Sequence, residues 1–189
     1  NSLIIGGIVD YTWFSLLNKR FYGGITELIR VNENGNTLLS QVYTQWKHRF
    51  TDKFSLVSGL HFQYLDLSNS IAIEPRTGLR YKLNDKHTLN LGYGLHSQMQ
   101  SIYTYFVQTH INDEVIYTNK NLDFTKSHHA VLTYDWNINN NLRLRTEAYH
   151  QWLFNAPVER TLSSFSALNT CADFAPSNAD SLINIGTGR

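Results

Sequence analysis

The sequence has little cysteine, no long apolar run and almost no net charge. Its single cysteine, Cys171, excludes an intramolecular disulfide framework and leaves the redox compartment open. No stretch approaches the roughly 20 apolar residues of a membrane helix, so a helical membrane protein is excluded. The 16 basic and 15 acidic residues nearly cancel, and the formal net charge of +1 gives no reason to expect a nucleic-acid partner.

Catalytic, cofactor and metal motifs are also missing. The sequence contains no nucleophile elbow, zincin motif or zinc ribbon, which argues against an enzyme. Gly92 and Gly94 lie inside a predicted strand, without the third glycine and the following helix of a dinucleotide loop, so no cofactor is expected. His128 and His129 are adjacent and point to opposite faces of a strand, so we expect no shared metal site.

What the sequence does contain is a long alternation of apolar and polar residues. Between Ile71 and Leu83, one face is mainly aliphatic and aromatic, and the other carries glutamate, arginine and lysine. An ordinary strand has about 5 to 6 residues, whereas a transmembrane β-strand needs about 9 to 11. The length therefore favours a strand that separates hydrocarbon from water.

The alternation recurs along the chain, in segments 3–14, 37–50, 54–66, 70–83, 88–95, 130–138 and 142–154. Tight polar turns are predicted at 51–53, 84–86 and 139–141, and longer connections at 18–35, 67–69, 98–129 and from 155 onward. Short turns at one end and long loops at the other are typical of outer-membrane barrels. Pro75 removes a ladder donor, so we expect a bulge near the outer rim.

The alternation alone does not separate a membrane barrel from a soluble sandwich, because both carry one apolar and one polar face. Aromatic residues make up 13% of the chain, and Tyr43, Trp46, Trp136 and Trp152 lie near predicted strand ends, where barrels carry aromatic girdles. We therefore predict an all-β, antiparallel up-and-down transmembrane barrel, with Leu79 and Leu144 facing lipid.

Charged residues on the polar faces are candidates for a lumen-facing surface. They would pair with each other or with material that fills the lumen, or line a path for an anionic solute. These residues are Glu74, Arg76, Arg80, Lys82, Arg143, Arg145 and Glu147.

Aromatic residues in the longest connection are candidates for ligand binding. Connections beyond about 12 to 15 residues are uncommon unless functional or disordered, and aromatic rings can stack on a sugar or a chelate. An aromatic cluster at the rim is the alternative. The candidates are Tyr103, Tyr105, Phe106 and Tyr117.

Four stretches, 74–81, 91–98, 121–129 and 184–189, together resemble the barrel of TonB-dependent outer-membrane receptors of the Bacteroidetes type. The resemblance implies a barrel of about 22 strands around an N-terminal plug, in the outer membrane of a Gram-negative bacterium. It also implies uptake of a scarce solute, such as a ferric chelate, cobalamin, a glycan or a peptide, with energy from TonB. Arg76, Arg80 and Arg145 would face the plug, and the connections 103–121 and 155–181 would be extracellular.

By that resemblance, residues 1–189 are about seven to eight strands of a larger barrel. The plug, the TonB box and the remaining strands would lie outside this sequence. The implied partners are outer-membrane lipid, the plug, the TonB complex and the solute, with no nucleic acid. Two alternatives are a small outer-membrane barrel that acts as an adhesin or structural protein, and a soluble carbohydrate-binding β-sandwich.

Overall fold

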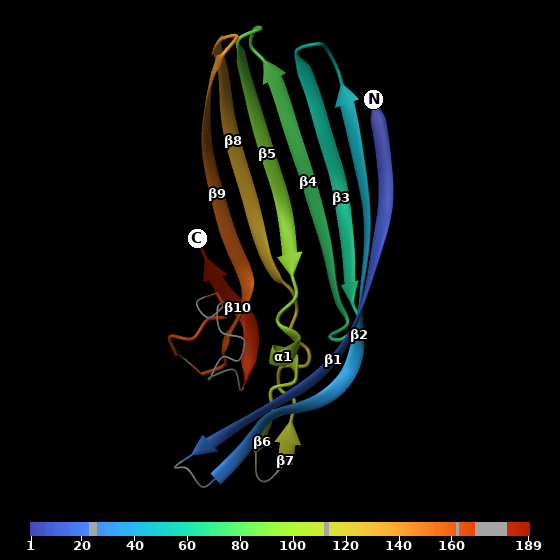
Figure 1. Cartoon of the computed structure of the whole chain (residues 1–189), viewed down its shortest axis with the longest axis vertical. Helices are drawn as coiled ribbons and strands as arrows, with labels where there is room; N and C mark the ends of the chain where they lie inside the picture. The colour runs from blue at the N-terminus through green and yellow to red at the C-terminus, as the bar shows by residue number, and fades with distance from the viewer. Residues whose placement is uncertain (23–25, 112–113, 162, 169–180) are drawn as a thin grey trace.

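The computed structural model describes all residues except 23–25, 112–113, 162 and 169–180, so Cys171 lies outside the described residues. Eight strands form one antiparallel sheet in the order β1-β2-β3-β4-β5-β8-β9-β10 (Figure 1). They are β1 (Ser2–Tyr22), β2 (Thr26–Arg49), β3 (Phe54–Leu65), β4 (Ser70–Lys82), β5 (His87–Gln98), β8 (Thr125–Asn139), β9 (Leu142–Glu159) and β10 (Leu182–Gly188). Connection 99–124, between β5 and β8, contains α1 (Ile102–Tyr105) and the hairpin of β6 (Thr109–Ile111) and β7 (Glu114–Ile116).

The all-β, antiparallel up-and-down prediction is confirmed. Strands of the large sheet pair with their neighbours in the chain, except where connection 99–124 separates β5 from β8. Short turns join β2 to β3, β4 to β5 and β8 to β9 at one end of the sheet (Figure 1). A soluble sandwich needs two packed sheets, whereas these eight strands lie in one.

Within the described residues, the structure has no helix of the length and apolarity that a membrane crossing requires.

The prediction that residues 18–35 form a connection is wrong. Residues 18–22 extend β1 and residues 26–35 extend β2, while residues 23–25 lie outside the described residues. The two strands pair from Ser2 and Lys47 to Tyr22 and Thr26, with one register shift between Asn18 and Lys19. The alternation fades there into a run rich in asparagine, but the main chains still pair because β-propensity is weaker than tertiary context. The seven predicted segments also omit β10, a seven-residue strand with two glycines.

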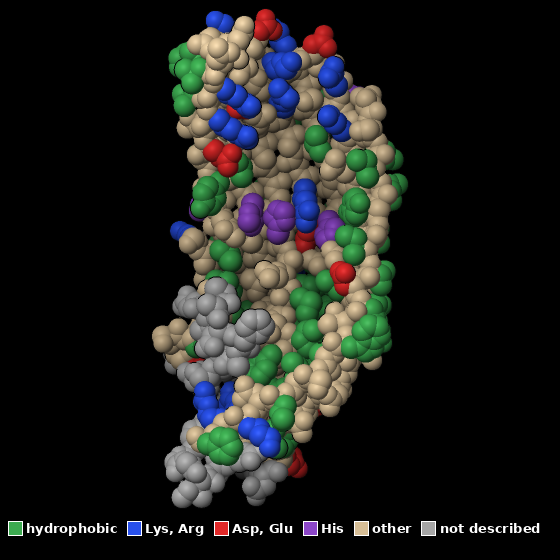
Figure 2. Space-filling model, viewed as in Figure 1, with side chains coloured by type: hydrophobic (Ala, Val, Ile, Leu, Met, Phe, Trp, Pro, Cys, Tyr) green, Lys and Arg blue, Asp and Glu red, His purple; other side chains and the backbone are tan. Residues whose placement is uncertain are grey.

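The large sheet has two chemically different faces. In β4, the exposed side chains of Ile71 and Ile73 alternate with the buried side chains of Ala72 and Glu74. Direct cross-strand partners share a face, so the pairing of Glu74 with His61 carries the polar face into β3. Figure 2 shows this polar face, where lysine and arginine gather toward the short turns and histidines lie midway.

The bulge predicted at Pro75 is also wrong. Pro75 lies opposite Leu60 in a β3–β4 register that has no shift. On the other side, the β4–β5 ladder starts only at Arg76 and Gly94. Pro75 therefore lies just beyond the end of the β4–β5 ladder. At this position its missing N–H does not interrupt the series of hydrogen bonds between β4 and β5.

A hydrophobic core lies at the long-loop end. Leu65 and Ala72, on the polar face of β3 and β4, are buried together with Tyr105, Val107 and Phe124 of connection 99–124. The backbone N–H of Gln108 donates to the Arg30 carbonyl of β2 at 2.8 Å. The connection therefore folds onto the polar face of the sheet.

Candidate functional site

A buried carboxylate lies at the centre of the polar face. Glu74 is only 1% exposed and accepts hydrogen bonds from His61 Nδ1 at 2.9 Å and Gln63 Nε2 at 2.6 Å. It also accepts from Arg76 Nη2 at 2.6 Å and from the backbone N–H of Ser97 at 2.7 Å. A buried charge is stable only when it is paired and hydrogen-bonded in this way. The Glu74 carboxylate is therefore held in a fixed position in the sheet by its four donors.

Glu74 and Gln63 replace the backbone ladder where β4 and β5 separate. The Glu74 carboxylate takes the N–H of Ser97, and the Gln63 amide donates to the Ser97 carbonyl at 3.1 Å. These two side chains satisfy the main-chain groups of Ser97 that β4 no longer reaches. Pro75 has no N–H to donate and is the first residue of β4 beyond the last β4–β5 pair.

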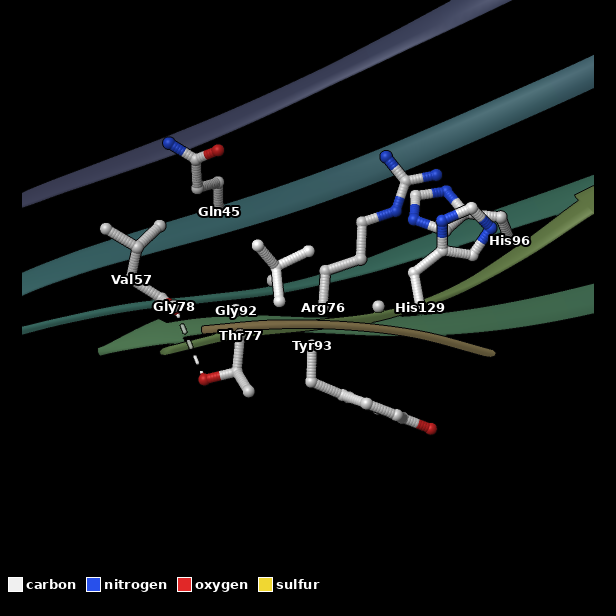
Figure 3. A pocket seen from close by; sticks show the side chains of 12 residues that line it. Gln45, Val57, Arg76, Thr77, Gly78, Gly92, Tyr93, His96 and His129 are labelled. Atoms are coloured by element: carbon white, nitrogen blue, oxygen red, sulfur yellow. Dashed lines mark hydrogen bonds between the residues drawn. The ribbon is translucent and has the colours of Figure 1, made fainter. Parts of the chain in front are cut away.

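Beside the carboxylate, Arg76, His96 and His129 converge at a cavity of about 420 Å³. Figure 3 shows their side chains grouped on one side of the sheet, with Thr77 and Tyr93 pointing to the other. The rings of His96 and His129 meet edge to face, with centroids 4.7 Å apart. The cavity thus has three nitrogen-rich side chains at one end.

A second charged cluster lies nearer the short turns. Arg143 donates to Asp135 Oδ1 through Nη2 at 2.5 Å and through Nε at 3.1 Å. Arg145 lies 3.9 Å from Asp135 and 3.7 Å from Glu147. Asn90 donates to Asp135 at 3.2 Å.

The seven charged residues predicted for the lumen all lie on the polar face, by the register of β4 and β9 with their neighbours. The structure divides them between the two clusters, and leaves Arg80 and Lys82 exposed beside a cavity of about 290 Å³ at the short turns. Their contact with a plug stays a prediction.

The histidines were the feature that sequence reasoning missed. His128 and His129 do point to opposite faces: His128 Nδ1 lies 2.8 Å from the Tyr93 hydroxyl, whereas His129 meets His96. The sequence predicted no shared site for His128 and His129, and only the strand register brings His129 against His96. In the described part of the chain, no group of three or more His, Cys, Asp or Glu side chains is arranged for a metal ion.

The aromatic candidates of connection 99–124 lie in or beside its core. Tyr105 is 0% exposed and Phe106 is 8% exposed, and the Phe106 ring packs on Phe14 of β1 with centroids 5.1 Å apart. Tyr103 and Tyr117 are half-buried. Burial gives Tyr105 and Phe106 a packing role, and solute binding by these four residues stays a prediction.

Two of these tyrosines have raised pKa values. Burial raises the pKa of Tyr105 to about 12. The Tyr117 hydroxyl donates to Glu33 Oε1 at 2.5 Å, and this hydrogen bond raises the pKa of Tyr117. Both phenols are therefore held in the neutral form.

A one-layer antiparallel sheet with an apolar face, a polar face, short turns and a folded long connection is the architecture of a section of β-barrel wall. The chain belongs to the TonB dependent receptor-like, beta-barrel family, whose sequence profile matches residues 6–189. The resemblance to TonB-dependent receptors is thereby confirmed, and the Bacteroidetes type stays a prediction. The family is one of outer-membrane receptors and transporters that work with a plug, TonB and a substrate.

Solved structures of similar fold include two mutants of the ferric enterobactin receptor PfeA from Pseudomonas aeruginosa. Each matches with a TM-score of 0.60 and 14% sequence identity, over 82% of this chain and 23% of the receptor chain. This chain thus spans about a quarter of the length of those receptors. No curated protein matches the chain.

Proposed function

We propose that the chain is part of the barrel wall of a TonB-dependent receptor that takes up a scarce solute across the outer membrane of a Gram-negative bacterium. The observation that carries the proposal is the two-faced sheet, with exposed aliphatic side chains on one side and the Glu74 network on the other. Hydrocarbon suits the first face, and a lumen filled by water or polypeptide suits the second.

The proposed lumen surface consists of the charged residues on the polar face. Arg76, Arg80 and Arg145 would contact the plug, which we place outside this sequence together with the TonB box and the remaining strands. Internal pairing, such as that between Glu74 and Arg76 at 2.6 Å, supports this role because charges facing a lumen are stable when paired. The apolar face would contact lipid.

The solute is a ferric chelate, cobalamin, a glycan or a peptide. A ferric chelate is the first to test, because the similar structures are receptors for ferric enterobactin. Connection 99–124 would form part of the extracellular mouth, with the half-buried Tyr103 and Tyr117 as the aromatic rings nearest to solvent.

The test is uptake by the full-length protein in its own host. A strain that lacks the gene should lose TonB-dependent accumulation of one radiolabelled solute from this set, and the restored gene should return it. Membrane fractionation should place the protein with the outer membrane. Uptake that is unchanged for every solute class, with the protein present at the surface, would instead favour an adhesin or structural barrel.

A further inference from the structure

We propose that Arg76, His96 and His129 form a binding subsite for an oxyanion group, a carboxylate or phosphate carried by a small solute in the lumen. The proposal rests on the proposed function, because it requires the polar face to line a water-accessible lumen. It assigns the remaining donors of Arg76 to the solute, and leaves contact with the plug to Arg80 and Arg145.

The strand register brings the three side chains together over a glycine. Gly94 lies directly between Arg76 on β4 and His129 on β8. The His96 ring folds back over Gly94, so that its Nε2 would lie 2.7 Å from a Cβ at that position. Glycine therefore creates the room in which an imidazole sits between a guanidinium and a second imidazole.

A second glycine opens the other flank of Arg76. Gly59 is the direct partner of Arg76 on β3, and Gly78 and Gly92 pair in the next row of the polar face. These four glycines line the cavity of about 420 Å³ together with Gln45, Val57 and Val131, and at their own positions no side chain fills it. That volume falls in the range of about 300 to 1,000 Å³ that is usual for small-molecule sites.

The three side chains offer donors that the protein does not use. Arg76 gives one nitrogen, Nη2, to Glu74, while the guanidinium has five N–H groups in total. Each imidazole has at least one N–H, and neither His96 nor His129 has a hydrogen-bonding side-chain partner within the described residues. Hydrogen bonds from the Arg76 guanidinium to an oxyanion are charge-assisted, and such bonds are about twice as strong as hydrogen bonds between neutral groups.

The charge presented to the cavity is positive. Glu74 is 1% exposed and its two oxygens are occupied by donors, whereas the side chain of Arg76 is 46% exposed. The other close polar residue of the cavity, Gln45, is neutral. A cation would meet the guanidinium, so the arrangement favours an anion.

An acidic side chain of the plug carries the same chemistry as a soluble anion, and the experiment has to separate the two. Purified full-length receptor in detergent is titrated by calorimetry with citrate and, separately, with inorganic phosphate at constant ionic strength. The variants are the double substitution His96→Gln with His129→Gln, which leaves every bond of Glu74 intact, and Arg76→Lys, which keeps the charge beside Glu74. Arg49→Gln, an exposed arginine on the same face near the short turns, is the matched control.

We expect the wild-type receptor and Arg49→Gln to bind at least one probe with equal affinity. The double histidine variant should bind that probe at least tenfold more weakly, and Arg76→Lys should also bind it more weakly. Wild-type-like affinity in the double variant overturns the proposal.

Absence of binding in the wild type also overturns it. If the wild type binds no probe and the double histidine variant melts at a lower temperature than the wild type, we conclude that an acidic side chain of the polypeptide occupies the site. Uptake measured on the same proteins separates the subsite hypothesis from the transport hypothesis. Uptake of a solute without probe binding contradicts only the subsite. Probe binding without uptake of any solute contradicts only the transport function.

Discussion

Gln63 reaches across β4 to bond Ser97, two strands away, with 3.1 Å between the amide nitrogen and the carbonyl oxygen. The same amide donates to Glu74 at 2.6 Å, and Glu74 accepts the N–H of Ser97. Three neighbouring strands are therefore joined at one height by side chains. The main-chain ladder between β3 and β4 continues through this height, whereas the ladder between β4 and β5 begins only at Arg76.

Replacement of the buried carboxylate should weaken this junction. We expect Glu74→Gln to destabilise the full-length barrel by about 1.5 to 3 kcal/mol, because charge-assisted bonds to three side chains and one N–H are lost or weakened. The measurement is the temperature at which the barrel loses its heat-modifiable band on a gel. Glu147→Gln, at a half-exposed carboxylate, should shift that temperature little. Equal shifts in the two variants would contradict a special role for Glu74.

The two faces predict opposite tolerance to charge at adjacent positions. Leu79 lies on the apolar face of β4 and Arg80 on the polar face. Arginine at a lipid-facing midplane site costs about 2 to 4 kcal/mol, so Leu79→Arg should reduce the yield of folded barrel, and Arg80→Gln should not. The yield is measured by surface labelling and by refolding into detergent. If both variants fold equally well, the assignment of faces is wrong.

Tyr105 should stabilise connection 99–124. Tyr105→Ala leaves a cavity in the core, for which large-to-small substitutions of aromatic residues cost about 3 to 5 kcal/mol. We expect faster protease cleavage of the connection on intact cells, with the barrel still folded. Val115→Ala, at an exposed residue of β7, is the control. A cleavage rate unchanged by Tyr105→Ala would show that Tyr105 does not stabilise connection 99–124.

The raised pKa values of Tyr105 and Tyr117 predict an alkaline transition. A phenol whose pKa is raised in the folded state contributes stability that is complete below its ordinary pKa of 10.0 and is lost as the pH rises through the folded pKa, about 12 for Tyr105. Connection 99–124 should therefore loosen between these pH values. Tyrosinate absorbance and protease sensitivity, followed together, test this. The Tyr105→Phe variant should lose part of this alkaline transition. If the variant shows the same transition as the wild type, groups other than Tyr105 cause it.

The two faces were predictable because they depend on local order. Alternation from Ile71 to Lys82 specifies which side chains share a side, whatever the strand pairs with. The assignment of Arg143 and Arg145 to the same polar face as Arg76 needed only the same rule in each strand. The all-β architecture followed from the repeated segments and the turns between them.

The site itself depended on long-range register. His96 and His129 are separated by connection 99–124, and their approach requires the particular β5–β8 pairing that sets Gly94 opposite His129. The contact between Glu74 and Ser97 needs β4 and β5 to part at Pro75, which single-strand patterns do not predict. The burial of Tyr105 and Phe106 could not be predicted, because their packing partners, such as Phe14, lie far away in the sequence.

Connection 99–124 shares its core with the wall, since Leu65 and Ala72 of the strands and Tyr105 and Phe124 of the connection are buried in one cluster. Lifting it from the sheet exposes apolar surface that is now dry, and breaks the bonds to Arg30 and Glu33. A rigid hinge motion would keep such contacts, whereas lifting connection 99–124 from the sheet breaks them. Movement of connection 99–124 away from the sheet would therefore require local unfolding of this cluster.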